Sequence, residues 1–148
     1  MIPIGRISDP GVAEFGREAR DFLSGKPWCK KVGEGYLAWA IAGVVGVFLF
    51  RLIPTRGDVD ETLWVVVGDL PPAYLVCDNA ADWHQALECY CREMQKWVTA
   101  VTRGTSLDSV IPVNAPPTLE YATMLESRLR FIRDRIVNAS PQKWESDK

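Results

Sequence analysis

The sequence predicts an α+β fold: an antiparallel sheet of about four strands, arranged as a meander, packed by an N-terminal helix and two longer C-terminal helices. Residues 36–41, 44–53 and 63–76 are rich in β-branched and aromatic side chains, which favour strands. Residues 80–103 and 119–137 repeat apolar side chains at steps of three and four, which indicates amphipathic helices. Because the strands follow one another, we expect helices and sheet to form separate layers rather than alternating βαβ units.

The first helix is expected to follow Asp9, a residue type that caps helices, and to begin at Pro10, which is favoured at the first helical position. Gly25 and Pro27 end the segment. Its apolar side chains form one stripe, which predicts that one face is buried. The stripe consists of Val12, Phe15, Ala19, Phe22 and Leu23.

The uncharged run 36–50 raises the question of a membrane span. It is too short, because a spanning helix needs about 20 apolar residues, and Gly43 and Gly46 interrupt it. We therefore predict two strands with a turn near Gly43. Residues 1–6 lack a basic stretch followed by an apolar one, so we expect no signal peptide and a cytoplasmic protein.

The segment 63–76 is the one around which the rest of the chain is expected to be organised. Two β-rich runs flank the turn Gly68–Pro72, which predicts a hairpin. Both runs are apolar on both faces, so we expect the hairpin in the middle of the core rather than at a wet edge. A sheet of this kind needs cover on two sides, from helices or from a partner.

Composition predicts a single α+β domain over residues 1–139, followed by a polar, mobile tail over residues 140–148. With 47% hydrophobic and 24% charged residues, a chain of 148 residues is long enough to bury a core. The net charge of −2 argues against nucleic acid as a partner, because such proteins carry a dominant basic surface.

The hairpin 63–76, the Trp-bearing helix that follows it and the final helix rich in Leu and Arg resemble those of a group of small uncharacterised bacterial proteins. The likeness covers most of residues 34–137. It implies a bacterial, cytosolic α+β protein, and it carries over no activity, cofactor or catalytic residue.

The sole histidine, His84, shares a helix face with Glu88, four residues further along the chain. Such a pair suits a metal or acid–base chemistry, but two ligands do not make a metal site, and we expect no metal and no cofactor. Cys77 precedes the same helix, whose N-terminus would lower a thiol pKa, so a Cys77–His84 nucleophile is the sharpest catalytic hypothesis. A solvent-facing histidine and a buried strand-end cysteine are the commoner interpretation.

The four cysteines are expected to be reduced thiols rather than a disulfide framework. Cys89 and Cys91 are two positions apart on a helix and point about 200° from each other, so they would not grip one ion. We expect Cys91 in the core and Cys89 as an exposed thiol.

Six tryptophans are many for this length, and tryptophan is favoured at interfaces. Trp64, Tyr74 and Trp83 are candidates to line an aromatic pocket between the long helix and the sheet.

The turn is the other binding candidate. Asp69, Pro71 and Pro72 would give a stiff, pre-organised loop that a partner can bind.

The favoured function is therefore a small non-enzymatic protein-interaction module, either a homo-oligomer or a neutralising partner of the immunity-protein kind. The alternatives are a small-molecule-binding domain with the aromatic pocket, and a small hydrolase or transferase that uses His84 with Cys77 or Glu88. The last helix is expected to expose a salt-bridged face, or else a surface for an anion or an acidic partner, through Arg128, Arg130, Arg133 and Arg135.

Overall fold

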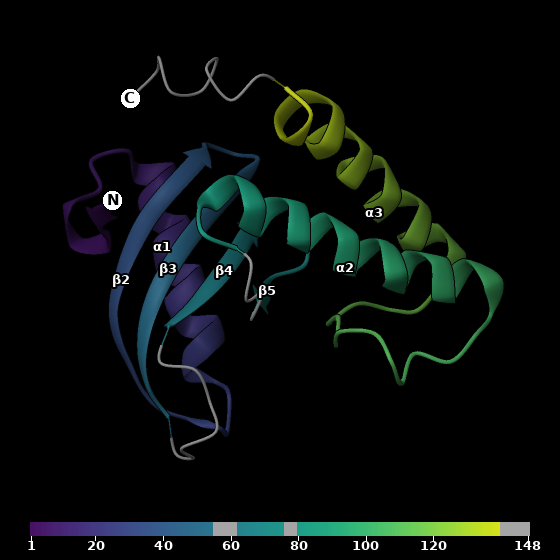
Figure 1. Cartoon of the computed structure of the whole chain (residues 1–148), viewed down its shortest axis with the longest axis horizontal. Coiled ribbons are helices and arrows are strands. Elements are labelled where there is room, and N and C mark those ends of the chain that lie inside the picture. Colours follow the sequence, from purple (N-terminus) through teal and green to yellow (C-terminus); the bar gives the residue numbers. More distant parts are fainter. Residues whose placement is uncertain (55–61, 76–79, 140–148) are drawn as a thin grey trace. The chain divides into compact units, whose positions relative to one another are not determined.

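A five-stranded antiparallel sheet forms the first part of the molecule. The computed structural model describes residues 1–54, 62–75 and 80–139. Each strand pairs with its neighbours in the chain, so the spatial order β1-β2-β3-β4-β5 is a meander (Figure 1). The predicted α+β fold is confirmed, with five strands rather than about four. The strands are β1 (Ile2–Pro3), β2 (Cys29–Ile41), β3 (Val45–Pro54), β4 (Thr62–Gly68) and β5 (Ala73–Leu75).

One helix precedes most of the sheet and two follow it, as predicted. Packing divides the chain into two units, one ending at Tyr90 and one beginning at Cys91. The expectation of a single domain over residues 1–139 stays a prediction, and the tail 140–148 lies outside the described residues. The helices are η1 (Ile4–Arg6), α1 (Pro10–Ser24), α2 (Trp83–Arg103), α3 (Leu119–Ile132) and a π-helical turn, η2 (Arg133–Val137).

Side-chain caps fix where the helices begin. The Asp9 carboxylate accepts a hydrogen bond from the Val12 amide at 2.9 Å, and the Thr118 hydroxyl accepts one from the Tyr121 amide at 3.2 Å. The cap at Asp9 matches the sequence prediction. α2 begins three residues later than predicted, after Asp82, whose side chain accepts from the Gln85 amide at 2.9 Å.

α1 covers one face of the sheet, and Figure 1 shows it behind the strands. Its Ala19 and Leu23 share a buried core with Phe48, Phe50 and Leu52, which alternate along β3. Each fully buried phenylalanine or leucine contributes about 1.5–3 kcal/mol of transfer free energy. This face is therefore a conventional helix-on-sheet core.

The opposite face of the sheet is equally apolar. Val47 of β3 and Val66 of β4 are directly paired and fully buried. Trp39, which pairs with Val47 from β2, stacks on Trp83 at the start of α2. The sheet thus has the two-sided cover that its sequence demanded.

The hairpin of residues 63–76 is not central in the way the sequence predicted. The middle strand is β3, and β5, the second arm of the hairpin, forms an edge of the sheet. Ala73 and Leu75 are nevertheless buried, to 4% and 3% exposure. An apolar sequence indicates that a strand is buried, but it does not indicate where in the sheet the strand lies. A covered edge strand and a central strand have the same apolar pattern.

β2 begins at Cys29, seven residues before the predicted start. Register shifts between β2 and β3 near Cys29, Gly33 and Ala38 let a glycine- and charge-bearing segment pair as a strand. The uncharged run 36–50 folds as the end of β2, a turn and the start of β3. Within the described ranges, no helix is long and apolar enough to cross a membrane.

The second unit contains the rest of α2 and α3. The Trp97 and Tyr121 rings meet edge to face, with centroids 6.1 Å apart. The Arg133 guanidinium donates to the side-chain oxygen of Gln95 at 3.0 Å and to the Cys91 carbonyl at 3.1 Å. The predicted last helix, 119–137, is α-helical only to Ile132, and its final turn is π-helical.

The close packing of two side chains over Gly35 predicts that Gly35→Ala destabilises the fold. An added Cβ would lie 2.4 Å from Phe50 Cε1 and 2.6 Å from Ile4 Cδ1, both packed side chains. Overpacking of this kind costs about 1–3 kcal/mol, measured as the free energy of unfolding in urea. Gly5→Ala is the control, since nothing lies within 4 Å of that position. Equal stability of the two variants would contradict the packing described.

An acidic side chain introduced at a buried position of β4 is expected to lower the free energy of unfolding far more than one introduced at the exposed end of the strand. Val66 is fully buried, so Val66→Asp would place an unpaired charge in the core at a cost of several kcal/mol, against a total stability of roughly 5–15. Thr62→Asp, on the same strand, is exposed and faces Arg51 across the ladder, so it should change stability by less than about 1 kcal/mol. Thermal unfolding of both variants checks the contrast.

Candidate functional site

Two tryptophans form a stacked pair between β2 and α2. The ring centroids of Trp39 and Trp83 are 4.4 Å apart and the rings are within 7° of parallel. His84 meets the Trp83 ring edge-on at 5.5 Å. All three side chains are half-buried, so part of the group faces solvent. We call Trp39, Trp83 and His84 the aromatic surface.

Trp64 supports this surface from β4, on the other side of β3 from β2. It lies on the same face of the sheet as Trp39, and its indole N–H donates to the Ala80 carbonyl at 3.0 Å. That bond ties the segment before α2 to β4. The rings therefore stand on a strand and a helix start that are already fixed, which limits the entropy lost when a partner binds.

The outer edge of β2 runs past the aromatic surface. β1 pairs with β2 only at Tyr36 and Leu37, and Arg20 donates to the backbone carbonyls of residues 32 and 33. No described strand lies along residues 38–41 on that side. An unpaired strand edge offers N–H and C=O groups to another polypeptide.

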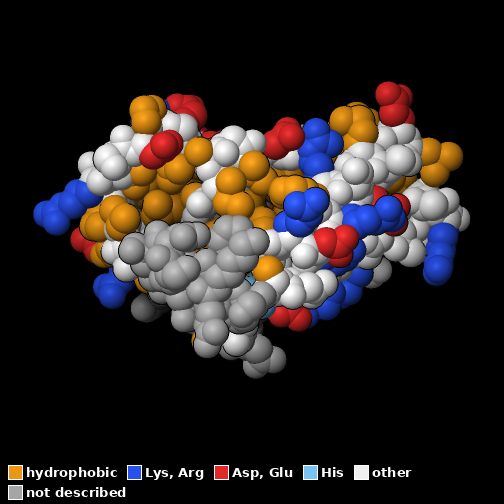
Figure 2. Space-filling model, turned by 90° about the horizontal axis from the view of Figure 1, so that it is seen from above, with side chains coloured by type: hydrophobic (Ala, Val, Ile, Leu, Met, Phe, Trp, Pro, Cys, Tyr) orange, Lys and Arg blue, Asp and Glu red, His pale blue; other side chains and the backbone are white. Residues whose placement is uncertain are grey.

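Hydrophobic side chains gather on this unit. Figure 2 shows a group of hydrophobic side chains at the surface over the part of the view that holds the sheet.

Tyr74 does not join the aromatic surface, which corrects the predicted pocket of Trp64, Tyr74 and Trp83. Tyr74 pairs with Val65, one position along from Trp64, so the strand alternation turns it to the opposite face. There it packs against Trp28, with centroids 5.0 Å apart, and Phe22, at 6.3 Å. The structure brings Trp64 and Trp83 to one face and places Tyr74 with α1.

The predicted turn Gly68–Pro72 is present, but part of it packs against the rest of the protein and is not exposed. Gly68 has φ +143°, and a Cβ there would lie 2.3 Å from the Val44 carbonyl oxygen. Pro71 is buried, and its carbonyl accepts a 2.6 Å hydrogen bond from the Tyr90 hydroxyl. Asp69 is exposed and Pro72 half-buried, so only part of the loop is open to a partner.

The catalytic candidates are not assembled into a site by the described residues. His84 is half-buried and Glu88 is exposed, and Cys77 lies outside the described residues. Across the described ranges, no group of three or more His, Cys, Asp or Glu side chains is placed to hold a metal ion. The histidine-based mechanism has no further support here.

The cysteines differ from their predicted states. Cys89 is 2% exposed and disulfide-bonded, not an exposed thiol, and Cys91 is buried as predicted. This disulfide corrects the expectation of a reduced thiol at Cys89, whereas the thiols of Cys29 and Cys91 are reduced, as expected. Disulfides are typical of oxidising compartments. Burial raises the pKa of the Cys29 thiol, against a smaller opposing effect of a backbone hydrogen bond from Lys31. A raised pKa disfavours the nucleophilic thiolate.

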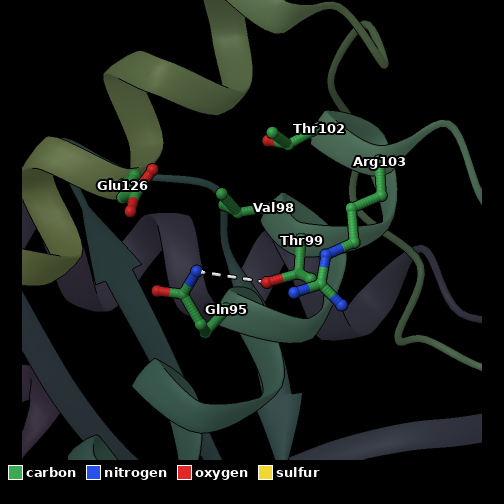
Figure 3. A pocket seen from close by; sticks show the side chains of 6 residues that line it. All are labelled: Gln95, Val98, Thr99, Thr102, Arg103 and Glu126. Carbon is green, nitrogen blue, oxygen red and sulfur yellow. Dashed lines mark hydrogen bonds between the residues drawn. The ribbon is translucent and has the colours of Figure 1, made fainter.

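A hollow lies in the second unit. It has a cavity volume of about 190 Å³, below the roughly 300–1,000 Å³ of ordinary ligand sites. Figure 3 shows Arg103 turned along α2 toward Thr99, with Glu126 facing them from α3. The volume is small and five of the six lining residues have polar side chains, so the hollow does not favour an apolar ligand. The lining residues are Gln95, Val98, Thr99, Thr102, Arg103 and Glu126.

Sequence reasoning missed Trp39 as a candidate. Trp39 lies in an uninterrupted apolar run, where nothing distinguishes a half-exposed tryptophan from a buried one. The alternation of β2 is also broken beside it, by the register shift between Leu37 and Trp39.

No family model, curated protein or solved structure matches this chain. The function is therefore argued from the geometry alone.

The hydroxyl of Tyr90 is expected to stabilise the turn. Tyr90→Phe would leave the buried Pro71 carbonyl without this donor, at a cost of about 1–3 kcal/mol in the free energy of unfolding. Tyr121→Phe is the matched control, because the part of Tyr121 that contacts Trp97 is its ring, which phenylalanine retains. Urea unfolding of both variants measures the difference. A Tyr90→Phe variant as stable as the control would contradict this role.

Proposed function

We propose that this chain is a non-enzymatic protein-interaction module that binds its partner through the aromatic surface. The observation that carries the proposal is the stacked, half-exposed Trp39–Trp83 pair, beside the part of β2 (residues 38–41) along whose outer edge no described strand lies. Tryptophan dominates the energetics of many interfaces, because one indole ring removes a large apolar area from water.

The support for a protein partner comes from the neighbourhood of the two rings. A strand edge gives an extended polypeptide backbone hydrogen bonds, while side-chain contacts beside it give specificity. A small molecule would instead need an enclosed pocket, and the aromatic pocket predicted from the sequence is divided between the two faces of the sheet. An extended segment of another protein fits this surface better than a metabolite does.

The rigidity of the aromatic surface also supports binding of a partner. Trp64 holds the segment before α2, and Trp39 stands on a strand paired along its length with β3. A pre-organised surface loses little conformational freedom on binding. The immunity-type role and the bacterial, cytoplasmic setting remain sequence-based expectations, and the disulfide at Cys89 weighs against the cytoplasm.

The test is capture of a partner from the native host by the tagged full chain and by Trp83→Ser. We expect the wild-type chain to retain a stoichiometric protein that the variant releases. Loss of a central interface tryptophan costs about 2 kcal/mol or more, which is a roughly thirtyfold weaker affinity. Mass spectrometry of the eluate identifies the partner, and titration with that purified protein measures the affinity.

Glu88→Ser is the control, because Glu88 is an exposed residue of the same helix outside the aromatic surface. Circular dichroism of both variants confirms that they are folded. Equal retention by Trp83→Ser and Glu88→Ser would place the contact elsewhere, and capture of nothing by the wild-type chain would refute the module.

A further inference from the structure

α3 exposes apolar side chains where α2 exposes none. The exposed residues of α2 are all polar, which is usual for a solvated helix face. In α3, Leu119, Met124 and Phe131 are 62%, 44% and 45% exposed, although the same helix buries Leu125 and Leu129. Apolar side chains on both faces indicate a helix that is covered on both faces.

The exposed side chains lie in a defined order along one face. Met124 and Phe131 are seven residues apart and therefore share a face, with the small Ser127 between them. Glu120 lies one turn before Met124, and the Arg135 guanidinium lies 5.9 Å from the centroid of the Phe131 ring. We call Glu120, Met124, Ser127, Phe131 and Arg135 the outer face of α3.

We propose that a second copy of this chain covers the outer face, with the two α3 helices antiparallel about a twofold axis near Ser127. The positions of these residues along the helix are symmetric about one point, which a twofold axis requires. An axis between Ser127 and Arg128 sets Met124 against Phe131 of the partner helix and Glu120 against its Arg135, and the same contacts recur on the other side of the axis.

The face is complementary to itself only in this direction. In a parallel pair, each Glu120 would meet Glu120 and each Arg135 would meet Arg135, which is repulsive. The antiparallel pair turns both contacts into ion pairs and buries the apolar side chains between them. Glu120 makes no ion pair with another described residue, so it is available for this contact.

The proposed association of two chains is expected to be weak. A single pair of helices buries less than the roughly 1,200 Å² of a stable interface, so the association should be weak and concentration-dependent. Arg128, next to the proposed axis, is half-buried and donates to the Met124 carbonyl of its own helix at 3.5 Å.

Charge reversal tests the register. Sedimentation equilibrium of the full chain, over micromolar to submillimolar concentrations, should show a monomer–dimer equilibrium. Glu120→Arg and Arg135→Glu should each lower the association constant about fivefold or more, because each turns both ion pairs into like-charge contacts. The double variant, with both substitutions in one chain, should restore the wild-type constant.

Mixing the two single variants gives the sharpest result. A Glu120→Arg chain and an Arg135→Glu chain have opposite charges at both contacts, so they should form a heterodimer more tightly than either forms a homodimer. Native mass spectrometry separates the three species. Arg92→Glu, an exposed change on α2, is the control and should leave the association constant unchanged.

A wild-type chain that stays monomeric across this range would overturn the proposal. So would a double variant, or a mixture, that associates no better than the single variants. Because Trp83 lies outside the outer face, Trp83→Ser should still dimerise, which separates this result from the test of the aromatic surface.

Discussion

The pairing of two strands that are apolar on both faces is the constraint on which the rest of this structure depends. Val45, Val47, Val65 and Val66 are fully buried although they project to opposite sides of β3 and β4. A sheet of this kind is stable in water only when something covers each side. α1 covers one side, and on the other side Trp83 at the start of α2 stacks on Trp39 of β2, so the aromatic surface is part of that cover.

The same constraint explains what the sequence could predict. Strand and helix identity followed from β-branched runs and from helical stripes, and the cap at Asp9 set the start of the first helix correctly. The two-sided apolar pattern correctly required cover on two sides. It did not place β5 at an edge, because a covered edge strand and a central strand carry the same residues. Register shifts, which hid the start of β2, leave no periodic signal at all.

The candidate site was predictable only in part, since it depends on which side chains meet across strands. Trp83 was singled out from the sequence, and its stacking partner Trp39 was not. Tyr74 was grouped with Trp64 although the ladder turns them to opposite faces, and knowing that requires the register. The outer face of α3 also could not be predicted from the sequence alone. Its apolar positions are visible in sequence, but their exposure is visible only once the buried seam of the same helix is known.

Native-state hydrogen exchange tests the doubly covered pair of strands most directly. The account predicts that amides in the β3–β4 ladder, such as those of Val47 and Val66, exchange only through global unfolding, with protection equal to the full free energy of unfolding. Amides of the two-residue strand β1 should exchange through smaller local openings. If the β3–β4 amides exchange at lower free energy than those of α3, the sheet is not the element on which the fold depends.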